Sequence, residues 1–191
     1  MADEAEGVDG SGRGWGPLYY HVMPRIINHF GFTVGAEIGV AFGGHACAIL
    51  DNTEIKRLYC VDPYTLVFPN TDGYSLPNGQ HFTQKEYEEL YLLAERRINR
   101  ERGPRGELIR ETSHAAWAMI RGKLDFVFID ARHTYEDLYT DIHIWRQRVR
   151  PGGIVAGHDY DHPSYPGIKK AVDEIFGKVN LEDGYVWWTQ I

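Results

Sequence analysis

Two apolar segments in the middle of the chain, 124–130 and 153–158, are predicted to be β-strands. The side chains at or shortly after their ends that can bind a metal ion or move a proton are Asp130, His133, His158 and Asp159. A helix of about a dozen residues separates the two strands, so we expect them to be parallel, with their carboxyl ends at the same edge. Ligands of open α/β sheets bind at that edge, so the four side chains should line one crevice.

Each of these residues also has a simpler interpretation. Asp130 ends an apolar strand, where an unpaired carboxylate would be costly, so we expect it to have a functional role. The neutral imidazole of His133 suits the removal of a proton from a hydroxyl group, and the alternative is a surface residue at a helix start. His158 is either a metal ligand or a hydrogen-bond donor that holds Asp130. Asp159 is either a functional carboxylate or a loop cap.

The composition is that of a soluble globular protein. The 191 residues carry a formal net charge of −7 and hold no run of basic residues of the kind that binds nucleic acid. Cys47 and Cys60 lie in apolar segments and are expected to be reduced core thiols. No apolar stretch is long enough to cross a membrane. We therefore expect a cytoplasmic protein without nucleic-acid or membrane partners.

Strands and helices alternate along most of the chain. Residues 1–16 are rich in glycine and acidic residues and are expected to form a disordered tail, whereas 17–191 should form a single domain. The predicted strands are 33–38, 57–62, 106–111, 124–130 and 153–158, followed by a hairpin around Glu182, Asp183 and Gly184. This alternation predicts an α/β fold, a three-layer sandwich around a mostly parallel seven-stranded sheet with a C-terminal antiparallel hairpin.

Local signals mark the predicted helices. A helix over 17–30 should be bent or split by Pro24. Thr83 and Glu86 form a capping-box pattern at the start of a charged helix. Further helices are expected over 45–52, from Ser113 onwards, between the two acid-ending strands, and over 167–177. Segment 63–82 is rich in Pro, Gly, Asn and aromatic residues and long for a connection, and a substrate lid is one interpretation of it.

A glycine-rich segment, GAEIGVAFGG at 35–44, follows the first predicted strand and opens a helix, where a nucleotide-like ligand meets backbone N–H groups. The dinucleotide fingerprint G-x-G-x-x-G is absent, because Gly39 is followed next by Gly43. Glu37 would repel a diphosphate but can pair with a cation. Asp62 ends the second strand about 20 residues further on, where a carboxylate can hold a ribose diol. S-adenosylmethionine has a ribose, a positive end and no phosphate, so it fits these residues better than NAD.

Four motifs occur together in this order: E-x-G-x-x-x-G in the glycine-rich segment, VDPY at 61–64, FIDARHTYED at 128–137 and PGGIVAGHDY at 151–160. In this combination the chain resembles the class I S-adenosylmethionine-dependent methyltransferases. It is most similar to the small metal-dependent O-methyltransferase-like group that acts on sugars and natural products. The resemblance covers about 34–177 and implies a Rossmann-like sandwich.

The resemblance also implies roles for individual residues. Gly39, Gly43 and their loop, with Glu37 beside them, would contact the methionine part of the cofactor, and Asp62 the ribose hydroxyls. Tyr64 and Ser113 would lie beside the ribose and the adenine. The metal ligands would be Asp130, His158 and Asp159, with His133 as the base and Asp130 also a catalytic residue. His158 departs from the family pattern, in which an oxygen ligand is usual. Mg²⁺ prefers oxygen ligands, so the site could instead take Mn²⁺, another first-row ion, or no metal.

The sequence thus predicts an O-methyltransferase that uses S-adenosyl-L-methionine and a divalent metal (Mg²⁺ or Mn²⁺) to methylate a hydroxyl group of a small molecule. Sugars, polyols and catechol-like compounds are the acceptor classes that we expect. A catalytically weak regulatory protein that binds S-adenosylmethionine or a nucleotide is the alternative, and His158 is the feature that favours it. An NAD-linked oxidoreductase would need the missing fingerprint. Assembly into a homo-oligomer is left open.

Overall fold

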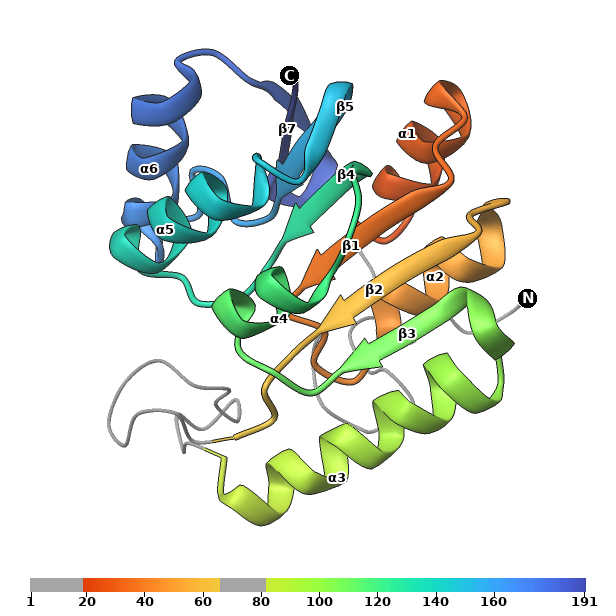
Figure 1. The fold of residues 1–191 in the computed structure, drawn as a ribbon. Helices are drawn as coiled ribbons and strands as arrows, with labels where there is room; N and C mark the ends of the chain where they lie inside the picture. The colour runs from red at the N-terminus through yellow and green to blue at the C-terminus, as the bar shows by residue number, and fades with distance from the viewer. Residues whose placement is uncertain (1–18, 66–81) are drawn as a thin grey trace, which may run out of the picture.

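The computed structural model describes residues 19–65 and 82–191, and in it the helices surround a central sheet (Figure 1). The seven strands of that sheet are β1 (Val34–Ile38), β2 (Arg57–Val61), β3 (Gly106–Ile109), β4 (Leu124–Ile129), β5 (Val149–Gly157), β6 (Asn180–Glu182) and β7 (Val186–Gln190). The strand order is β3-β2-β1-β4-β5-β7-β6. Strands β1 to β5 pair in parallel, and β7 runs antiparallel to both β5 and β6. The predicted seven-stranded sheet with a C-terminal antiparallel pair is confirmed.

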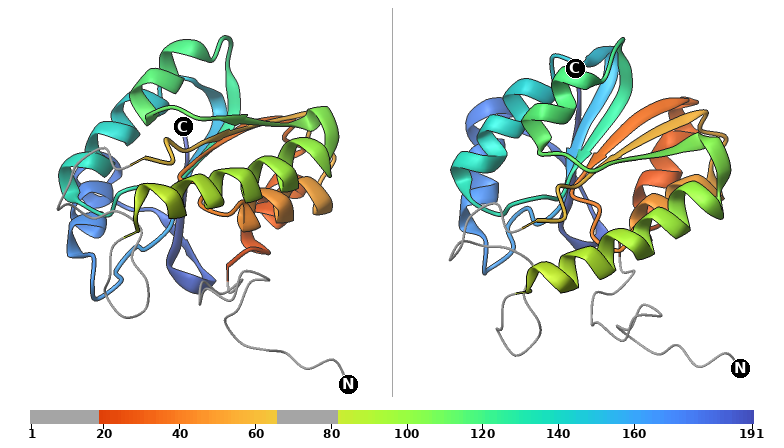
Figure 2. Two further views of the ribbon diagram at one scale, coloured as in Figure 1. Left: turned by 90° about the horizontal axis from the view of Figure 1, so that it is seen from below. Right: turned by 60° about the horizontal axis from the view of Figure 1, so that its bottom comes forward.

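Helices cover both faces of the sheet, as the two views of Figure 2 show. The six α-helices of the described residues are α1 (Val22–Phe30), α2 (Gly44–Asn52), α3 (Gln84–Glu95), α4 (Ser113–Met119), α5 (Tyr135–Trp145) and α6 (Pro166–Phe176). The core has one part against α1, α2 and α3 and another against α4, α5 and α6. Successive residues of β4 pack alternately into the two parts, with Phe126 and Phe128 in the first and Val127 and Ile129 in the second. This alternation produces the predicted three layers.

Strand order reverses between β1 and β4, because the chain leaves β1 toward β2 on one side and reaches β4 on the other. The loops after β1 and β4 therefore leave the same edge in different directions and open a crevice between them. Hydrogen bonds continue the ladder past the strand ends, from Asp130 N to Ile38 O (2.8 Å) and from Gly39 N to Val61 O (2.9 Å). The candidate site lies at this switch point.

Two helices test the local signals read from the sequence. Helix α1 begins at Val22, so Pro24 lies in its first turn, where no N–H partner is needed, and the predicted bend at Pro24 is wrong. The capping box at Thr83 is confirmed, with the Thr83 backbone N–H donating to Glu86 Oε2 at 2.7 Å. Helix α3 ends at Glu95 and continues as a π-helical turn, Arg96–Arg100.

Two of the sequence predictions fall outside the described residues. The tail over 1–16 lies there completely, as does most of segment 63–82, for which a substrate lid was one interpretation. The aromatic residues at the described ends of that segment, Tyr64 and Phe82, are both buried in the core. Within 19–65 and 82–191, no helix combines the length and apolar character that a membrane crossing requires.

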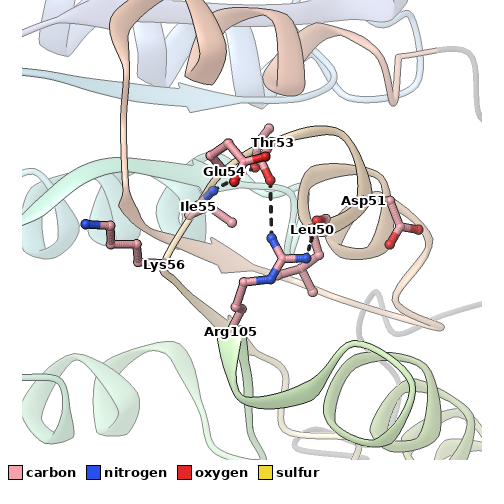
Figure 3. A pocket seen from close by; sticks show the side chains of 7 residues that line it. All are labelled: Leu50, Asp51, Thr53, Glu54, Ile55, Lys56 and Arg105. Carbon is pink, nitrogen blue, oxygen red and sulfur yellow. Dashed lines mark hydrogen bonds between the residues drawn. The ribbon is translucent and has the colours of Figure 1, made fainter.

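The opposite edge of the sheet also carries a pocket, where α2 ends and β2 and β3 begin (Figure 3). Its floor includes Arg105, whose guanidinium donates to the carbonyl oxygens of Leu50 (2.8 Å) and Thr53 (3.2 Å). Those carbonyls are left without helical partners at the end of α2, so the arginine caps the helix. We therefore assign this pocket a structural role.

Candidate active site at the carboxyl edge

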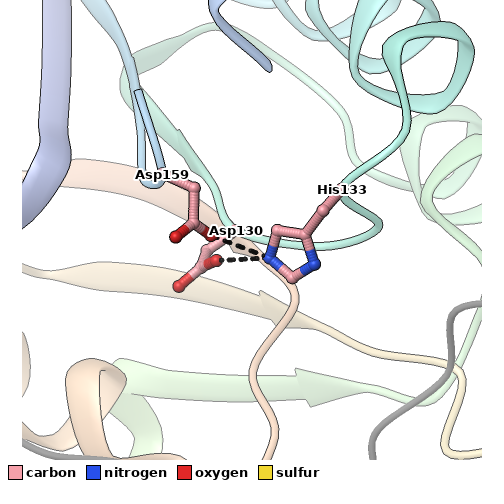
Figure 4. Close-up of side chains that lie close together, drawn as sticks. All are labelled: Asp130, His133 and Asp159. Carbon is pink, nitrogen blue, oxygen red and sulfur yellow. Dashed lines mark ion pairs between the residues drawn. The ribbon is translucent and has the colours of Figure 1, made fainter. Parts of the chain in front are cut away.

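Two carboxylates and two imidazoles meet at the carboxyl ends of β4 and β5. The Nε2 atom of His133 is 2.9 Å from Asp159 Oδ2 and 3.5 Å from Asp130 Oδ1, as Figure 4 shows. The Nδ1 atom of His158 is 3.2 Å from Asp159 Oδ2 and 3.7 Å from Asp130 Oδ2. The structure thus brings together the four residues that the sequence placed in one crevice. We call them the acid–imidazole cluster.

The backbone fixes the direction of each of these side chains. Asp130 directly follows β4, and His158 follows β5, with its N–H bonded to Ile129 O at 3.2 Å. Asp159 has a φ of 61°, a left-handed conformation that is unfavourable for a residue with a side chain. This conformation turns the Asp159 carboxylate back toward His133. The ring of His133 stacks on Tyr165, with the ring centroids 4.3 Å apart.

The cluster has unusual proton affinities. Burial alone would raise the pKa of Asp130, but the His133 and His158 imidazoles outweigh it and hold that pKa well below its ordinary value. Burial alone would lower the pKa values of the imidazoles, yet the two carboxylates raise that of His133 to about 9 and that of His158 to about 10. Without a bound cation, both imidazoles are therefore protonated at neutral pH and balance both carboxylates.

This charge pattern gives the cation-free protein a characteristic pH dependence of stability. The raised pKa values of His133 and His158 contribute stability that is complete below the unfolded value of about 6.5 and lost as the pH rises through 9 to 10. Urea unfolding in chelator should show the unfolding free energy decreasing progressively, by several kcal/mol in total, as the pH rises from about 6.5 to about 10. A double variant, His133→Gln with His158→Gln, should show a flatter profile, and an equal decrease in it would contradict this assignment.

The donor set of the cluster is suited to a divalent first-row ion. One ligand atom each from Asp130, His133 and Asp159 lie within 4.8 Å of one another, close enough to surround a single cation. Such a cation would supply the positive charge that the protonated imidazoles otherwise supply. Mixed carboxylate and imidazole ligands suit Mn²⁺ and its neighbours better than Mg²⁺, which prefers oxygen. The residues therefore fit a metal, with Mn²⁺ favoured.

Tyr19 contacts two residues of the cluster, and the sequence motifs do not identify it. Its hydroxyl donates to Asp130 Oδ2 at 2.6 Å, and its ring stacks on His158 with centroids 4.0 Å apart. Burial is the largest cause that raises the Tyr19 pKa well above 10, so the phenol stays a donor. No motif surrounds this residue, which lies 111 positions before its aspartate partner.

Hydrogen bonds to the Asp62 carboxylate fix the glycine loop after β1. One Asp62 oxygen accepts hydrogen bonds from the N–H groups of Val40 and Ala41, both at 3.0 Å, and the other accepts from Tyr64 N, also at 3.0 Å. Gly39 approaches the Asp130 backbone so closely that a Cβ atom would lie 1.9 Å from the Asp130 carbonyl oxygen. Gly43 has a φ of 82°, which only glycine adopts easily. The loop thus has a fixed shape directly beside the acid–imidazole cluster.

The hydroxyl groups of Tyr64 and Ser113 already have protein partners. Tyr64 Oη donates to Ala41 O at 2.8 Å, so this buried ring supports the glycine loop. Ser113 Oγ donates to Asp141 and accepts from Trp145 Nε1 at 2.8 Å, which ties α4 to α5. Burial raises the pKa of Asp141 to about 6. Their predicted places beside the ribose and adenine stay predictions.

Glu37 forms a buried pair with His45, the second residue of α2. Glu37 Oε2 is 3.5 Å from His45 Nδ1, and both side chains are almost fully buried. Neither this oxygen nor either imidazole nitrogen has a hydrogen-bond partner among the described residues. Burial raises the pKa of Glu37. Three buried polar atoms next to the glycine loop can therefore still form hydrogen bonds.

The chain matches a known protein family. Residues 36–160, well over half of the chain, match the family described as "Methyltransferase domain". That match contains the glycine loop, Asp62 and the complete stretch from Asp130 to Asp159. An uncharacterized protein of Acanthamoeba polyphaga mimivirus is 24% identical over 173 residues, which are 85% of this chain and 68% of the viral protein.

Solved structures share the fold. An O-methyltransferase from Bacillus cereus, in complex with SAH, has a TM-score of 0.65 and 14% identity, covering 98% of this chain and 84% of that one. Apo CalS11, a TDP-rhamnose 3′-O-methyltransferase in calicheamicin biosynthesis, has a TM-score of 0.61 and 17% identity, covering 90% and 76%. At these identities the likeness establishes the fold.

Proposed function

Because this chain belongs to the methyltransferase domain family, we propose that it transfers the methyl group of S-adenosyl-L-methionine to a hydroxyl group of a small molecule, assisted by a divalent cation. The observation that carries the proposal is the direct contact between the glycine loop and the acid–imidazole cluster. Gly39 lies against the backbone of Asp130, so a cofactor on the loop would have its reactive end beside the cluster.

The cofactor part of the proposal rests on the two acidic side chains next to the glycine loop, Asp62 and Glu37. The Val40 and Ala41 N–H groups, which could hold a phosphate, already donate to the Asp62 carboxylate. A diphosphate could not use these two N–H groups as donors, and it would lie close to the carboxyl groups of Asp62 and Glu37. A cofactor with a ribose and a cationic end avoids both problems. In this proposal Glu37 faces the methionyl ammonium group, and Tyr64 and Ser113 line the adenosyl site.

Methyl transfer needs alignment and the removal of one proton. The acceptor oxygen attacks the methyl carbon in line with the sulfur, the S–C bond breaks as the O–C bond forms, and the sulfonium becomes a neutral thioether. The proton of the acceptor goes to the imidazole of His133. A divalent cation held by Asp130, Asp159 and His158 would lower the pKa of the acceptor hydroxyl. Asp130 and Asp159 also hold the two imidazoles in place.

The acceptor side of the cluster is bordered by rings. His133 stacks on Tyr165, whose ring is 5.0 Å from that of His162, and His162 in turn meets the exposed Tyr185. Stacked rings favour an acceptor that has a ring of its own. We propose a sugar or a catechol-like compound with adjacent hydroxyl groups. CalS11, which has a similar structure, is a TDP-rhamnose 3′-O-methyltransferase, and this similarity supports the sugar among the two acceptor classes.

A regulatory protein that binds S-adenosylmethionine is the second candidate. The observation that favours it is the charge balance of the cluster, since His133 and His158 already neutralise Asp130 and Asp159 without a cation. Slow consumption of S-adenosylmethionine by the pure protein, accelerated by Mn²⁺ and a vicinal diol, would exclude this candidate. Tight cofactor binding with no consumption under any of these conditions would favour it.

Calorimetry with S-adenosylhomocysteine and NAD tests the cofactor. We expect S-adenosylhomocysteine to bind and NAD to bind at least about 100-fold more weakly, because the Val40 and Ala41 N–H groups of the loop already donate to Asp62 and a diphosphate would lie close to that carboxylate. Asp62→Ala should weaken S-adenosylhomocysteine by about 1–3 kcal/mol, since it removes the charged acceptor that shapes the loop. Asp125→Ala, at the far end of β4, is the control and should leave the affinity unchanged. Equal affinity for the two ligands would contradict the proposal.

A further inference from the structure

We propose that Tyr19 is a positioning residue for the acid–imidazole cluster, holding Asp130 with its hydroxyl and His158 with its ring so that both are ready for a divalent cation. The inference rests on the proposed function, because it assigns Tyr19 a task in the metal assistance of that reaction. It extends the site beyond the residues between Asp130 and Asp159, to a segment that precedes α1.

The hydroxyl of Tyr19 contacts one particular oxygen of Asp130. It donates to Oδ2 at 2.6 Å, whereas Oδ1 of the same carboxylate faces His133 at 3.5 Å. A carboxylate with one oxygen held by a protein donor has a fixed rotation about its Cβ–Cγ bond. The other oxygen, Oδ1, is then kept on the side of the carboxylate that faces His133. Such outer hydrogen bonds orient metal ligands in many proteins.

The ring of Tyr19 restrains His158 in a second, independent way. The two rings stack with centroids 4.0 Å apart and an interplanar angle of 27°. The stack limits rotation of the imidazole, whose Nδ1 is 3.2 Å from Asp159 Oδ2. One side chain thus fixes a residue after β4 through its hydroxyl and a residue after β5 through its face.

The backbone of Tyr19 is itself held on two sides. Its carbonyl accepts from Val22 N at 3.0 Å at the start of α1. The turn between β6 and β7 presses against it, because a Cβ atom on Gly184 would lie 2.9 Å from Tyr19 Cβ. An ion pair of 2.6 Å between Arg25 and Glu182 joins α1 to β6 beside this contact. These contacts therefore hold Tyr19 in a fixed position, which a positioning role requires.

Two substitutions separate the tasks of the hydroxyl and the ring. Tyr19→Phe removes the donor to Asp130 and keeps the stack, and Tyr19→Leu removes both. Tyr135→Phe is the matched control, since Tyr135 also donates to a carboxylate, that of Glu174 at 2.8 Å, but away from the cluster. Mn²⁺ affinity from the electron paramagnetic resonance of free Mn²⁺ is the main measurement. Affinity for S-adenosylhomocysteine shows whether each variant is folded.

We expect Tyr19→Phe to weaken Mn²⁺ binding by about 10- to 100-fold, with Tyr19→Leu weaker still and Tyr135→Phe unchanged. Affinity for S-adenosylhomocysteine should stay within about twofold in all three, because Tyr19 acts on the metal ligands. In NMR spectra without metal, the His158 ring signals should shift in Tyr19→Leu, which loses the ring current, and far less in Tyr19→Phe.

The outcomes separate this inference from the proposed function. If the parent protein binds Mn²⁺ and Tyr19→Phe binds it equally well, the inference is wrong and the proposed function stands. If the parent binds S-adenosylhomocysteine but no Mn²⁺, the proposed metal assistance is wrong, and the role of Tyr19 falls with it. If Tyr19→Phe loses affinity for S-adenosylhomocysteine as much as for Mn²⁺, Tyr19 supports the fold in general, and the positioning role is wrong.

Discussion

Asp130→Asn is expected to lower turnover by about 10³-fold or more and to abolish Mn²⁺ binding, while affinity for S-adenosylhomocysteine changes little. Asp130 is the centre of the cluster, where it accepts from Tyr19 and faces both His133 and His158. The amide of Asp130→Asn removes a negative charge that stabilises the protonated forms of both imidazoles. It also presents an NH₂ group to donors, which leaves buried polar atoms without partners.

Asp125→Asn is the matched control for this prediction. Asp125 lies at the opposite end of the same strand, where its carboxylate accepts from the N–H groups of Thr33 and Val34 and pairs with Arg150. Its loss should lower stability but leave Mn²⁺ affinity unchanged. Rapid quench measurements of methyl transfer, with and without chelator, give the turnover. Full activity of the parent in chelator would show that the reaction needs no cation, and full activity of Asp130→Asn with Mn²⁺ would show that Asp130 is not needed.

The position of the cluster was predictable because it depends on strand direction alone. Parallel strands that end in Asp130 and in His158-Asp159 must present these residues at one edge, whatever the rest of the chain does. The alternating apolar pattern of the strands and the capping box at Thr83 are local signals of the same kind. Each is set by neighbours within a few residues, so it can be read without knowing the packing.

Features that depend on packing between distant segments were not predictable. Tyr19 reaches Asp130 only because α1 and the β6–β7 turn hold it there, and nothing near residue 19 marks this contact. The three backbone hydrogen bonds of Asp62 likewise depend on the exact path of the glycine loop. A helix that begins at 17, as the sequence predicts, would place Pro24 in its interior and be bent by it. A helix that begins at Val22 accommodates it in the first turn.

His133→Gln is expected to lower turnover by about 10²–10⁴-fold, the usual contribution of a positioned base, while Mn²⁺ affinity stays within about tenfold. The geometry allows two roles, because His133 Nε2 lies close enough to Asp130 and Asp159 to serve as a ligand as well as a base. Glutamine keeps a polar side chain of similar length but cannot accept the proton. His158→Gln should show the reverse pattern, with a large loss of Mn²⁺ affinity.

The pH dependence distinguishes the two roles further. In the cation-free protein the two carboxylates raise the pKa of His133 to about 9, so its imidazole is charged at neutral pH and cannot accept a proton. A cation held by the same carboxylates would add positive charge, which would lower the proton affinity of His133 and favour its neutral form near pH 7. Turnover with Mn²⁺ should therefore fall in acid as His133 becomes protonated, and His133→Gln should lose this acid limb. If His133→Gln instead loses Mn²⁺ and His158→Gln keeps it, His133 is the ligand, and the proton of the acceptor would then go to Asp130 or to water.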